Sequence, residues 1–217
     1  RIGVLTETGG IRPTAAERSA AVEAAAITLE RDGHSLSVLD WADFDDMVAA
    51  SGQTFGDIVA VNLAAVFRAL SLDTDQAEPL TRAFVERGRA LSGTALWESL
   101  DAGVLVSRDL WRIFEHVDVV LAPMLASAPP PIGSFSSDHD DTALQLDRIA
   151  AFAPLASLAN ISGFPAITVA FGADHEDMPL PVQFIAPFGH EFLLLALAAR
   201  LEAEGRWRHR FPVAGLA

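Results

Sequence analysis

The side chains that could do chemistry in this sequence are few and stand in short polar stretches. Ser134, Ser136 and Ser137 lie together after a run of prolines, and a serine becomes a nucleophile when a neighbouring base activates it. The chain contains no G-x-S-x-G sequence, which is the local signature of many serine hydrolases. A Ser–His–Asp hydrolase complete within this chain is therefore not indicated, and we expect these serines to form a solvated turn.

Two histidines stand among carboxylates and invite interpretation as metal ligands. His139 lies between Asp138 and Asp140, and His175 lies between Asp174 and Glu176. Neither stretch has the H-E-x-x-H spacing that brings two histidines to one helix face. We expect both to be solvated acidic loops, and we predict no metal and no other cofactor.

The composition excludes several kinds of chemistry and partner. Cysteine is absent, which excludes disulfides and cysteine-ligated zinc within the chain and fits a cytoplasmic location. Lysine is also absent, so this chain supplies no lysine base or Schiff base. The formal net charge of −14 disfavours nucleic acid. The longest apolar run, residues 192–199, is much shorter than the roughly 18 residues of a membrane helix, so we expect no membrane partner.

The elements that must position any site alternate between strands and helices. Strands over residues 2–5 and 35–39 enclose a helix over 14–31, which predicts a βαβ unit with parallel strands. The sequence opens directly on the first of these strands without an initiator Met, so we expect either that the chain was cut here or that the numbering begins at a segment boundary. Apolar spacing predicts further helices over 55–70, 80–91, 93–117, 143–151, 154–160 and 191–204, strands over 118–123, 166–171 and 181–186, and a basic tail over 206–210. This order predicts one compact α/β unit.

Several short motifs resemble, in order, the end of amidase-signature enzymes. The family typically reads N-x-x-G-x-P-A before a strand, then G-L-P-x-G-x-Q, then a helix. The matching residues here are Asn160, Gly163, Pro165 and Ala166, then Met178, Pro179 and Gln183, then Phe188, Gly189 and Glu191 before a Leu/Ala-rich helix. Residues 118–123 and the proline-rich loop after them resemble the family's D-x-x-x-x-P strand and loop. Landmarks of the resemblance run from residue 1 to about residue 207.

Other stretches narrow the resemblance within the family. Residues 78–82, 86–89 and 129–133 look most like broad-specificity bacterial amidases, including relatives that open the cyclic dimer of 6-aminohexanoate. Pro181 stands where the family usually has Gly, and Ala170 where Pro is common. We interpret both as subfamily drift near strand ends. Glutamine-dependent amidotransferase subunits usually carry an acidic residue shortly before the Asn, and its absence here argues against that branch.

The resemblance implies a fold and indicates which half of the enzyme carries the catalytic residues. The fold class is α/β, with residues 1–217 as the C-terminal portion of a single amidase-signature domain. They would form part of a mixed β-sheet flanked by helices on both faces. Family members hydrolyse amides with a Ser–cis-Ser–Lys triad and a Gly/Ser-rich oxyanion loop in the N-terminal half. Because this chain has neither a lysine nor such a loop, we predict that it holds no catalytic residue and is inactive alone.

Five residues are predicted to contact the substrate. Met124 and Leu125 follow the end of a predicted central strand, where ligands of open α/β sheets bind. Phe152 precedes the N-x-x-G motif and would form another wall. Asn62 is polar within an apolar helix, so it faces either the substrate channel or the surface. Trp97 belongs either to the core or to the pocket lining.

Two functions from different classes remain open at this point. The first is an amidase acting on a carboxylic or cyclic amide, with a small-molecule amide substrate, the N-terminal half of the same enzyme as partner, and a possible homodimer. The alternative is a non-catalytic binding or scaffold module derived from the amidase fold. The first predicts an exposed apolar sheet edge, because half a sheet leaves strands unpaired. Asn160 is expected to fix the backbone of its turn by hydrogen bonds.

Overall fold

The computed structural model describes residues 1–9 and 13–208, and their strands and helices alternate as expected. The predicted basic tail extends beyond the described part at residue 209. The strands are β1 (Ile2–Val4), β2 (Leu36–Val38), β3 (Val119–Pro123), β4 (Ala166–Ala173) and β5 (Pro179–Ile185). The α-helices are α1 (Ala16–Arg31), α2 (Asp45–Ala69), α3 (Pro79–Ala90), α4 (Gly93–Phe114), α5 (Thr142–Phe152), α6 (Ala156–Ser162) and α7 (Glu191–Glu202).

The strands form one mixed sheet in the order β2-β1-β3-β5-β4. β1 pairs in parallel with β2, to which α1 returns the chain, and also with β3, which follows α4. β5 lies antiparallel to β3 and to β4, and a hairpin joins β4 to β5. The expected βαβ unit is confirmed.

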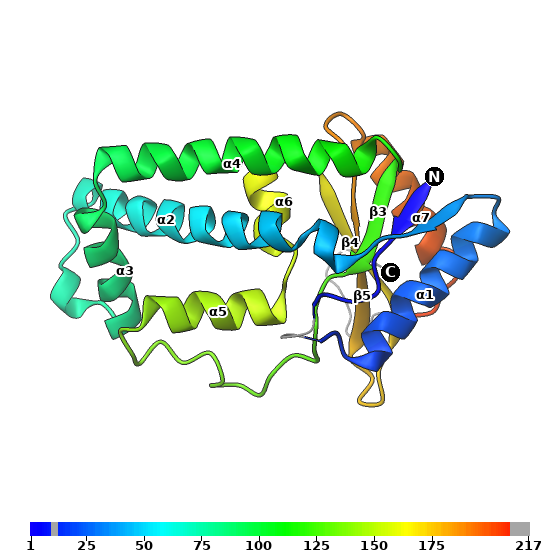
Figure 1. Cartoon of the computed structure of the whole chain (residues 1–217). Helices are drawn as coiled ribbons and strands as arrows, with labels where there is room; N and C mark the ends of the chain where they lie inside the picture. The colour runs from blue at the N-terminus through cyan, green and yellow to red at the C-terminus, as the bar shows by residue number, and fades with distance from the viewer. Residues whose placement is uncertain (10–12, 209–217) are drawn as a thin grey trace.

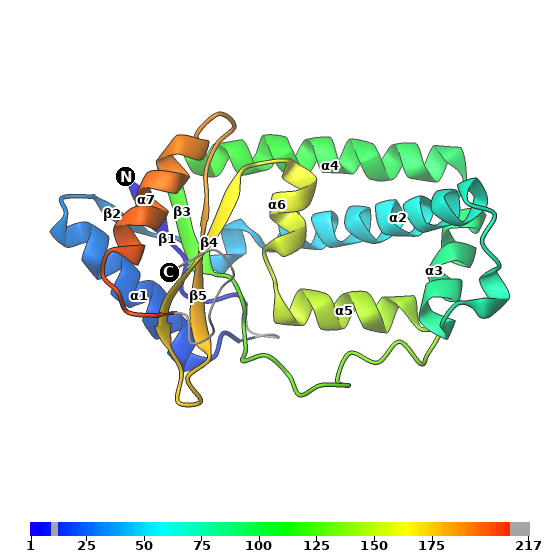
Figure 2. The same ribbon diagram turned by 180° about the vertical axis from the view of Figure 1, so that it is seen from behind.

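Alternating side chains of the central strand β3 enter two separate cores. Val119 and Leu121 pack with α1 and α7 on one face of the sheet, while Val120 and Ala122 pack with α4 and α6 on the other. Figures 1 and 2 show α1 and α7 beside the sheet on the side away from the remaining helices. The predicted mixed sheet with helices on both faces is confirmed.

The helices of the second face extend well beyond the sheet. α2, α4 and α5 project from it side by side, and α3 closes their far ends (Figure 1). A small third core of Ala60, Leu80 and Phe84 holds α2 against α3. Polar caps set two of the helix starts: Ser92 accepts a hydrogen bond from the Ala95 N–H, and Asp141 accepts one from the Leu144 N–H.

One predicted boundary is wrong. The helix expected over residues 55–70 begins at Asp45, ten residues earlier. Its first half buries Ser51, Thr54 and Asp57, which hydrogen-bond to neighbouring helices and so occupy positions where apolar side chains would be expected. Hydrophobic spacing therefore marks only the second half of α2.

The two edge strands of the sheet are β2 and β4. Val38 on β2 is 91% exposed. Within residues 1–9 and 13–208, no helix combines the length and apolarity needed to cross a membrane.

Candidate active site

A cavity of about 390 Å³ lies between the helices that project from the sheet. Its walls come from the first half of α2, from α5 and from α6, and Arg87 of α3 closes one side. The lining residues are Val48, Ala49, Gly52, Gln53, Phe55, Arg87, Ala143, Leu146, Asp147, Ile149, Ala150, Ala153, Ala156, Ser157 and Asn160. A mostly apolar pocket of this size with a few polar groups is typical of small-molecule sites.

Small side chains are the reason that this cavity exists. Gly52 on α2 has nothing within 4 Å of the position that a Cβ would take. Ala150 on α5 and Ala153 and Ala156 beside it face the same space. These short side chains leave the gap between the helices unfilled.

The cavity combines hydrogen-bonding groups with its apolar walls. Ser157 lies with its Oγ 3.1 Å from the Oγ of Ser51, and Ser51 can donate to the Val48 carbonyl at 2.9 Å. Asn160 donates to the Ala156 carbonyl at 2.8 Å. The expected hydrogen bond from Asn160 to backbone is thus present, although it lies within α6 and not in a turn.

A buried polar network fixes the wall that contains Arg87. Arg87 Nη2 donates to Asp57 Oδ1 at 2.7 Å, and Ser99 Oγ donates to Asp57 Oδ2 at 2.9 Å. Thr54 Oγ1 in turn donates to the Ser99 carbonyl at 3.0 Å. Since Asp57 is buried and both its oxygens accept hydrogen bonds, the network ties α2, α3 and α4 into one rigid wall.

The carboxyl end of the central strand lies next to this cavity. The chain leaves β3 at Pro123, and Ala126 N–H then donates to the Phe152 carbonyl at 2.9 Å. This bond holds the loop after β3 against the end of α5. Ligands of α/β sheets bind at such strand ends. Ala153, which lines the cavity, directly follows Phe152, so this wall of the cavity lies next to the loop that leaves the sheet.

Three of the five predicted substrate contacts lie near the end of β3, and the other two lie on the long helices α2 and α4. Met124, Leu125 and Phe152 are partly buried near the end of β3, and Phe152 also packs on Phe135. Asn62 is exposed on the second half of α2. None of the five lines the cavity itself, so their assignment as substrate contacts stays a prediction.

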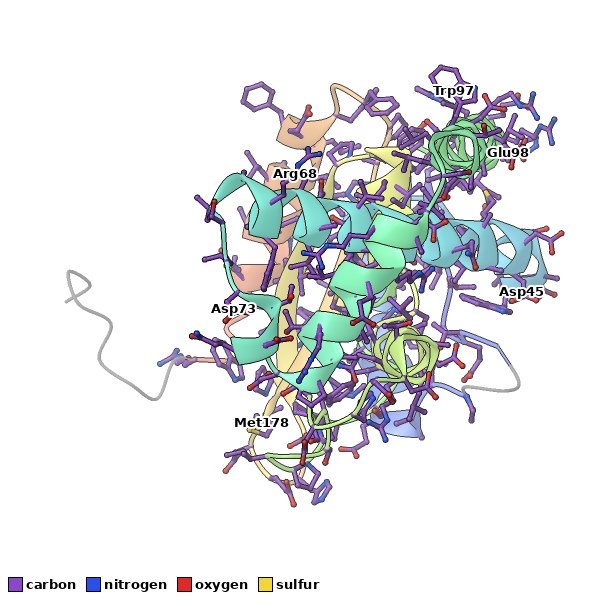
Figure 3. All side chains as sticks on the ribbon, turned by 90° about the vertical axis from the view of Figure 1, so that its left-hand side faces the viewer. Asp45, Arg68, Asp73, Trp97, Glu98 and Met178 are labelled. Carbon is purple, nitrogen blue, oxygen red and sulfur yellow. The ribbon has the colours of Figure 1, made fainter. Side chains whose placement is uncertain are left out.

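The predicted placement of Trp97 in the core is wrong, because its side chain is 71% exposed. Figure 3 shows it on the outer side of α4, pointing away from the helices beneath. It continues an exposed apolar strip on α4 that includes Leu100, Val104 and Trp111. Apolar residues at helical spacing predict a buried helix face, but this face of α4 is exposed.

The sequence gives little sign of the residues that do line the cavity. Gln53 and Ser157 carry no motif of their own, and Arg87 enters only through the stretch that resembles broad-specificity amidases. The usable signal is the presence of small residues on the two facing helices, Ala49 and Gly52 on α2 and Ala143 and Ala150 on α5, which indicates space between them. Among the described residues, His139 and His175 belong to no cluster suited to a metal ion.

Comparisons with known proteins identify the family. The amidase family model matches residues 1–195. AmiB2 of Mycobacterium tuberculosis, provisionally named an amidase, is 32% identical over 89% of this chain, which covers 40% of that relative. AmiA2 of the same species, also provisionally named an amidase, is 34% identical over 58% of this chain and 25% of its own length. The chain thus spans less than half the length of the curated relatives that it matches.

Solved structures agree with the family and the fold. The structure of 6-aminohexanoate cyclic dimer hydrolase superposes with a TM-score of 0.82 at 27% identity, over 95% of this chain and 45% of that one. A bacterial aryl acylamidase of the amidase-signature family gives a TM-score of 0.72 at 17% identity, over 95% of this chain and 44% of that one, and shows the fold alone. With a family model that matches nine tenths of its length, the chain belongs to the amidase family.

Proposed function

We propose that this chain is the C-terminal portion of an amidase that hydrolyses a carboxylic or cyclic amide. The observation that carries the proposal is the cavity beside the carboxyl end of β3, in a chain that belongs to the amidase family and contains no lysine. The Ser–cis-Ser–Lys triad of the family would lie in an N-terminal half, and this chain would complete the sheet and form the acyl pocket.

The division of the reaction follows from the chemistry. A serine of the N-terminal half attacks the amide carbonyl, and a neutral lysine takes its proton through the middle serine. Backbone N–H groups of the Gly/Ser-rich loop stabilise the oxyanion. The cavity holds the acyl chain so that its carbonyl lies near the loop after β3, where Met124, Leu125 and Phe152 would contact it.

Two further features support an N-terminal partner. Val38 on the edge strand β2 is exposed, and so is the apolar strip on α4. Apolar surfaces of this kind are normally covered in a complete domain. The substrate of the similar cyclic dimer hydrolase, a cyclic amide, is compatible with a mostly apolar pocket.

The test uses the full-length protein and a fluorophosphonate probe that labels activated serines. We expect one labelled serine outside residues 1–217 and loss of labelling when the upstream lysine is replaced. An adduct on Ser134, Ser136 or Ser137 would contradict the proposal. The scaffold alternative predicts no labelling and no hydrolysis of any anilide.

A further inference from the structure

We propose that residues 127–153 form a movable flap over the cavity, and that this flap opens to admit the acyl group of the substrate. The flap consists of the loop that follows Ala126 and of the helix α5. Leu146 holds it closed by packing on the bare backbone of Gly56 in α2. This inference rests on the proposed amidase function and adds to it the route by which the acyl group enters.

The flap contains no buried residue, although the residues that flank it are buried. Every position from 127 to 153 is exposed or half-buried, whereas Ala126 and Leu155 are 3% and 0% exposed. The shorter helix α6 buries Leu158 and Ser162, while α5 buries none of its residues. Segments with few buried apolar contacts open locally at a small fraction of the global unfolding free energy. The flap therefore opens while the sheet and its cores stay folded.

The inner face of α5 lies over the cavity instead of over a packed core. Figures 1 and 2 show α5 along α2, on the side of α2 away from α4. Residues at helical spacing on this face line the cavity, namely Ala143, Leu146, Asp147 and Ala150. A helix that covers an empty space gains little dispersion energy from beneath. Among the walls of the cavity, α5 is thus the one that can lift without disrupting a core.

The two ends of the flap are joined at its base. The Ala126 N–H donates to the Phe152 carbonyl at 2.9 Å, so the chain enters and leaves the flap at nearly the same place. Leu155, just beyond, packs in the core that also holds the side chains of β3 on this face. Because the base is fixed and the rest of the flap is not, the flap can swing about its base as one unit.

One side chain of the flap holds it closed. Leu146 packs against the small core between α2 and α3. A Cβ on Gly56 would lie 2.6 Å from Cδ1 of Leu146, so a side chain at position 56 would push the leucine out of its seat. The loop of the flap is held by one backbone hydrogen bond to α3, from the Leu80 N–H to the Ser137 carbonyl at 3.2 Å. Both contacts can break without exposing the main cores of the sheet.

The closed position also leaves two buried polar atoms of the flap without partners. In the described part of the chain, Oε1 of Gln145 and Nε2 of His139 are buried and make no hydrogen bond. A buried polar atom without a partner destabilises the arrangement that buries it, and water can satisfy both atoms once the flap lifts. The contact of Leu146 favours the closed position and these two atoms oppose it, which brings the open and closed positions close in free energy.

The flap can be locked by a disulfide, because this chain contains no cysteine. Gly56→Cys combined with Leu146→Cys brings two β-carbons within reach of a disulfide, as the close approach of Leu146 to position 56 shows. The full-length enzyme carries this pair with any other cysteine replaced by serine. Oxidation locks the flap and dithiothreitol releases it, so each protein serves as its own reference.

The matched control joins two helices outside the flap. Gly103→Cys combined with Ile161→Cys links α4 to α6, since a Cβ on Gly103 would lie 3.1 Å from Cγ2 of Ile161. Neither position lines the cavity under α5. The control therefore has the same chemistry and a similar starting contact, but its disulfide leaves the flap free.

The 4-nitroanilides of nonanoic acid and of acetic acid measure the effect of the lock. On oxidation of the locked variant, kcat/KM for the nonanoyl compound should fall by about tenfold or more, because a closed lid blocks entry to the cavity. The acetyl group is too short to need the cavity, so its kcat/KM should change by less than about twofold. Dithiothreitol should restore the nonanoyl activity. The control variant should hydrolyse both compounds equally well when oxidised and when reduced.

Hydrogen exchange of the wild-type, full-length enzyme tests the flap without any substitution. We expect the backbone amides of α5 to exchange about tenfold faster, or more, than those of α6, which follows directly in the chain and has buried residues. Saturating nonanoate should slow exchange in α5, because it fills the space beneath that helix. Exchange in α1, on the other face of the sheet, should not change.

The outcomes separate this inference from the function on which it rests. Equal hydrolysis of the nonanoyl compound by the locked and the released enzyme overturns the inference and leaves the amidase function standing. An equal loss for both anilides on oxidation does the same, since it would place the effect at the reacting centre. Exchange in α5 as slow as in α6 also overturns it, even where the double variants fail to fold. If the wild type hydrolyses neither anilide and takes up no serine probe, the amidase function and this route of entry both fall.

Discussion

Arg87 on α3 and Asp57 on α2 form an ion pair of 2.7 Å in the wall of the cavity. The pair does two things at once, because Asp57 also accepts from Ser99 on α4. It holds three helices together, and it fixes the plane of a guanidinium that lines the pocket. Replacing either partner should therefore lower the free energy of unfolding and change the shape of the cavity wall.

Asp57→Ala should lower the free energy of unfolding by about 3 kcal/mol, since it leaves the guanidinium without its charge partner. Urea denaturation of the full-length protein measures the change. The matched control is Arg31→Ala, which removes an exposed arginine whose pair with Glu204 is long, at 3.8 Å. We expect the control to lie within about 0.5 kcal/mol of wild type. Equal decreases in the free energy of unfolding in the two variants would show that the buried pair stabilises the protein no more than the exposed one.

Gly88→Ala should destabilise the protein by at least about 1–3 kcal/mol through overpacking. An added Cβ would lie 2.0 Å from the carbonyl oxygen of Ala60, so α3 would have to move away from α2. Gly52→Ala is the control, because its Cβ meets nothing within 4 Å. That change should instead stabilise α2 by about 0.5–1 kcal/mol. Thermal melting of both variants tests the contrast in sign.

Gly52→Leu should shorten the range of acyl groups that the full-length enzyme accepts. The new side chain enters the space between α2 and α5, which the small residues leave open. We expect kcat/KM for a nonanoyl anilide to fall by about tenfold or more, while an acetyl anilide changes little. Gly93→Leu adds the same side chain at an open position away from the cavity and serves as the control. A uniform loss for short and long acyl groups would argue that this space does not hold the acyl chain.

The elements with strong apolar periods are the ones that the sequence predicts well. β3 alternates between two cores, and the run of residues 118–123 already indicates it. The start of α2 is missed because its buried face is built from Ser51, Thr54 and Asp57, whose partners come from other helices. Such pairs are invisible to any one-dimensional pattern of hydrophobicity.

The candidate site also has one part that the sequence predicts and one part that it does not. The loop after β3 can be predicted, because strand ends are where α/β sheets bind ligands. The cavity cannot, because it arises where short side chains of α2 and α5 face each other across residues almost a hundred positions apart. Trp97 shows the opposite error, since a large apolar side chain at helical spacing is here exposed. Whether a face is covered depends on partners outside the helix.

Asp118→Asn should remove part of the acid sensitivity of the fold. The guanidinium and the amino-terminal ammonium of Arg1 each donate to Asp118 at 2.8 Å, and together they hold the pKa of this carboxyl down, to about 2. Because the folded pKa lies below the unfolded value of about 3.9, the pair stabilises the protein above about pH 4. That stabilisation is lost as the pH falls towards 2. The melting temperature of wild type should therefore exceed that of Asp118→Asn at pH 5, and the difference should shrink as the pH falls and be largely lost only below about pH 2. The pair is half exposed, so salt should shrink the difference at pH 5. A difference in melting temperature that stays constant from pH 5 to pH 2.5 would mean that the ionised Asp118 does not hold β3 to β1.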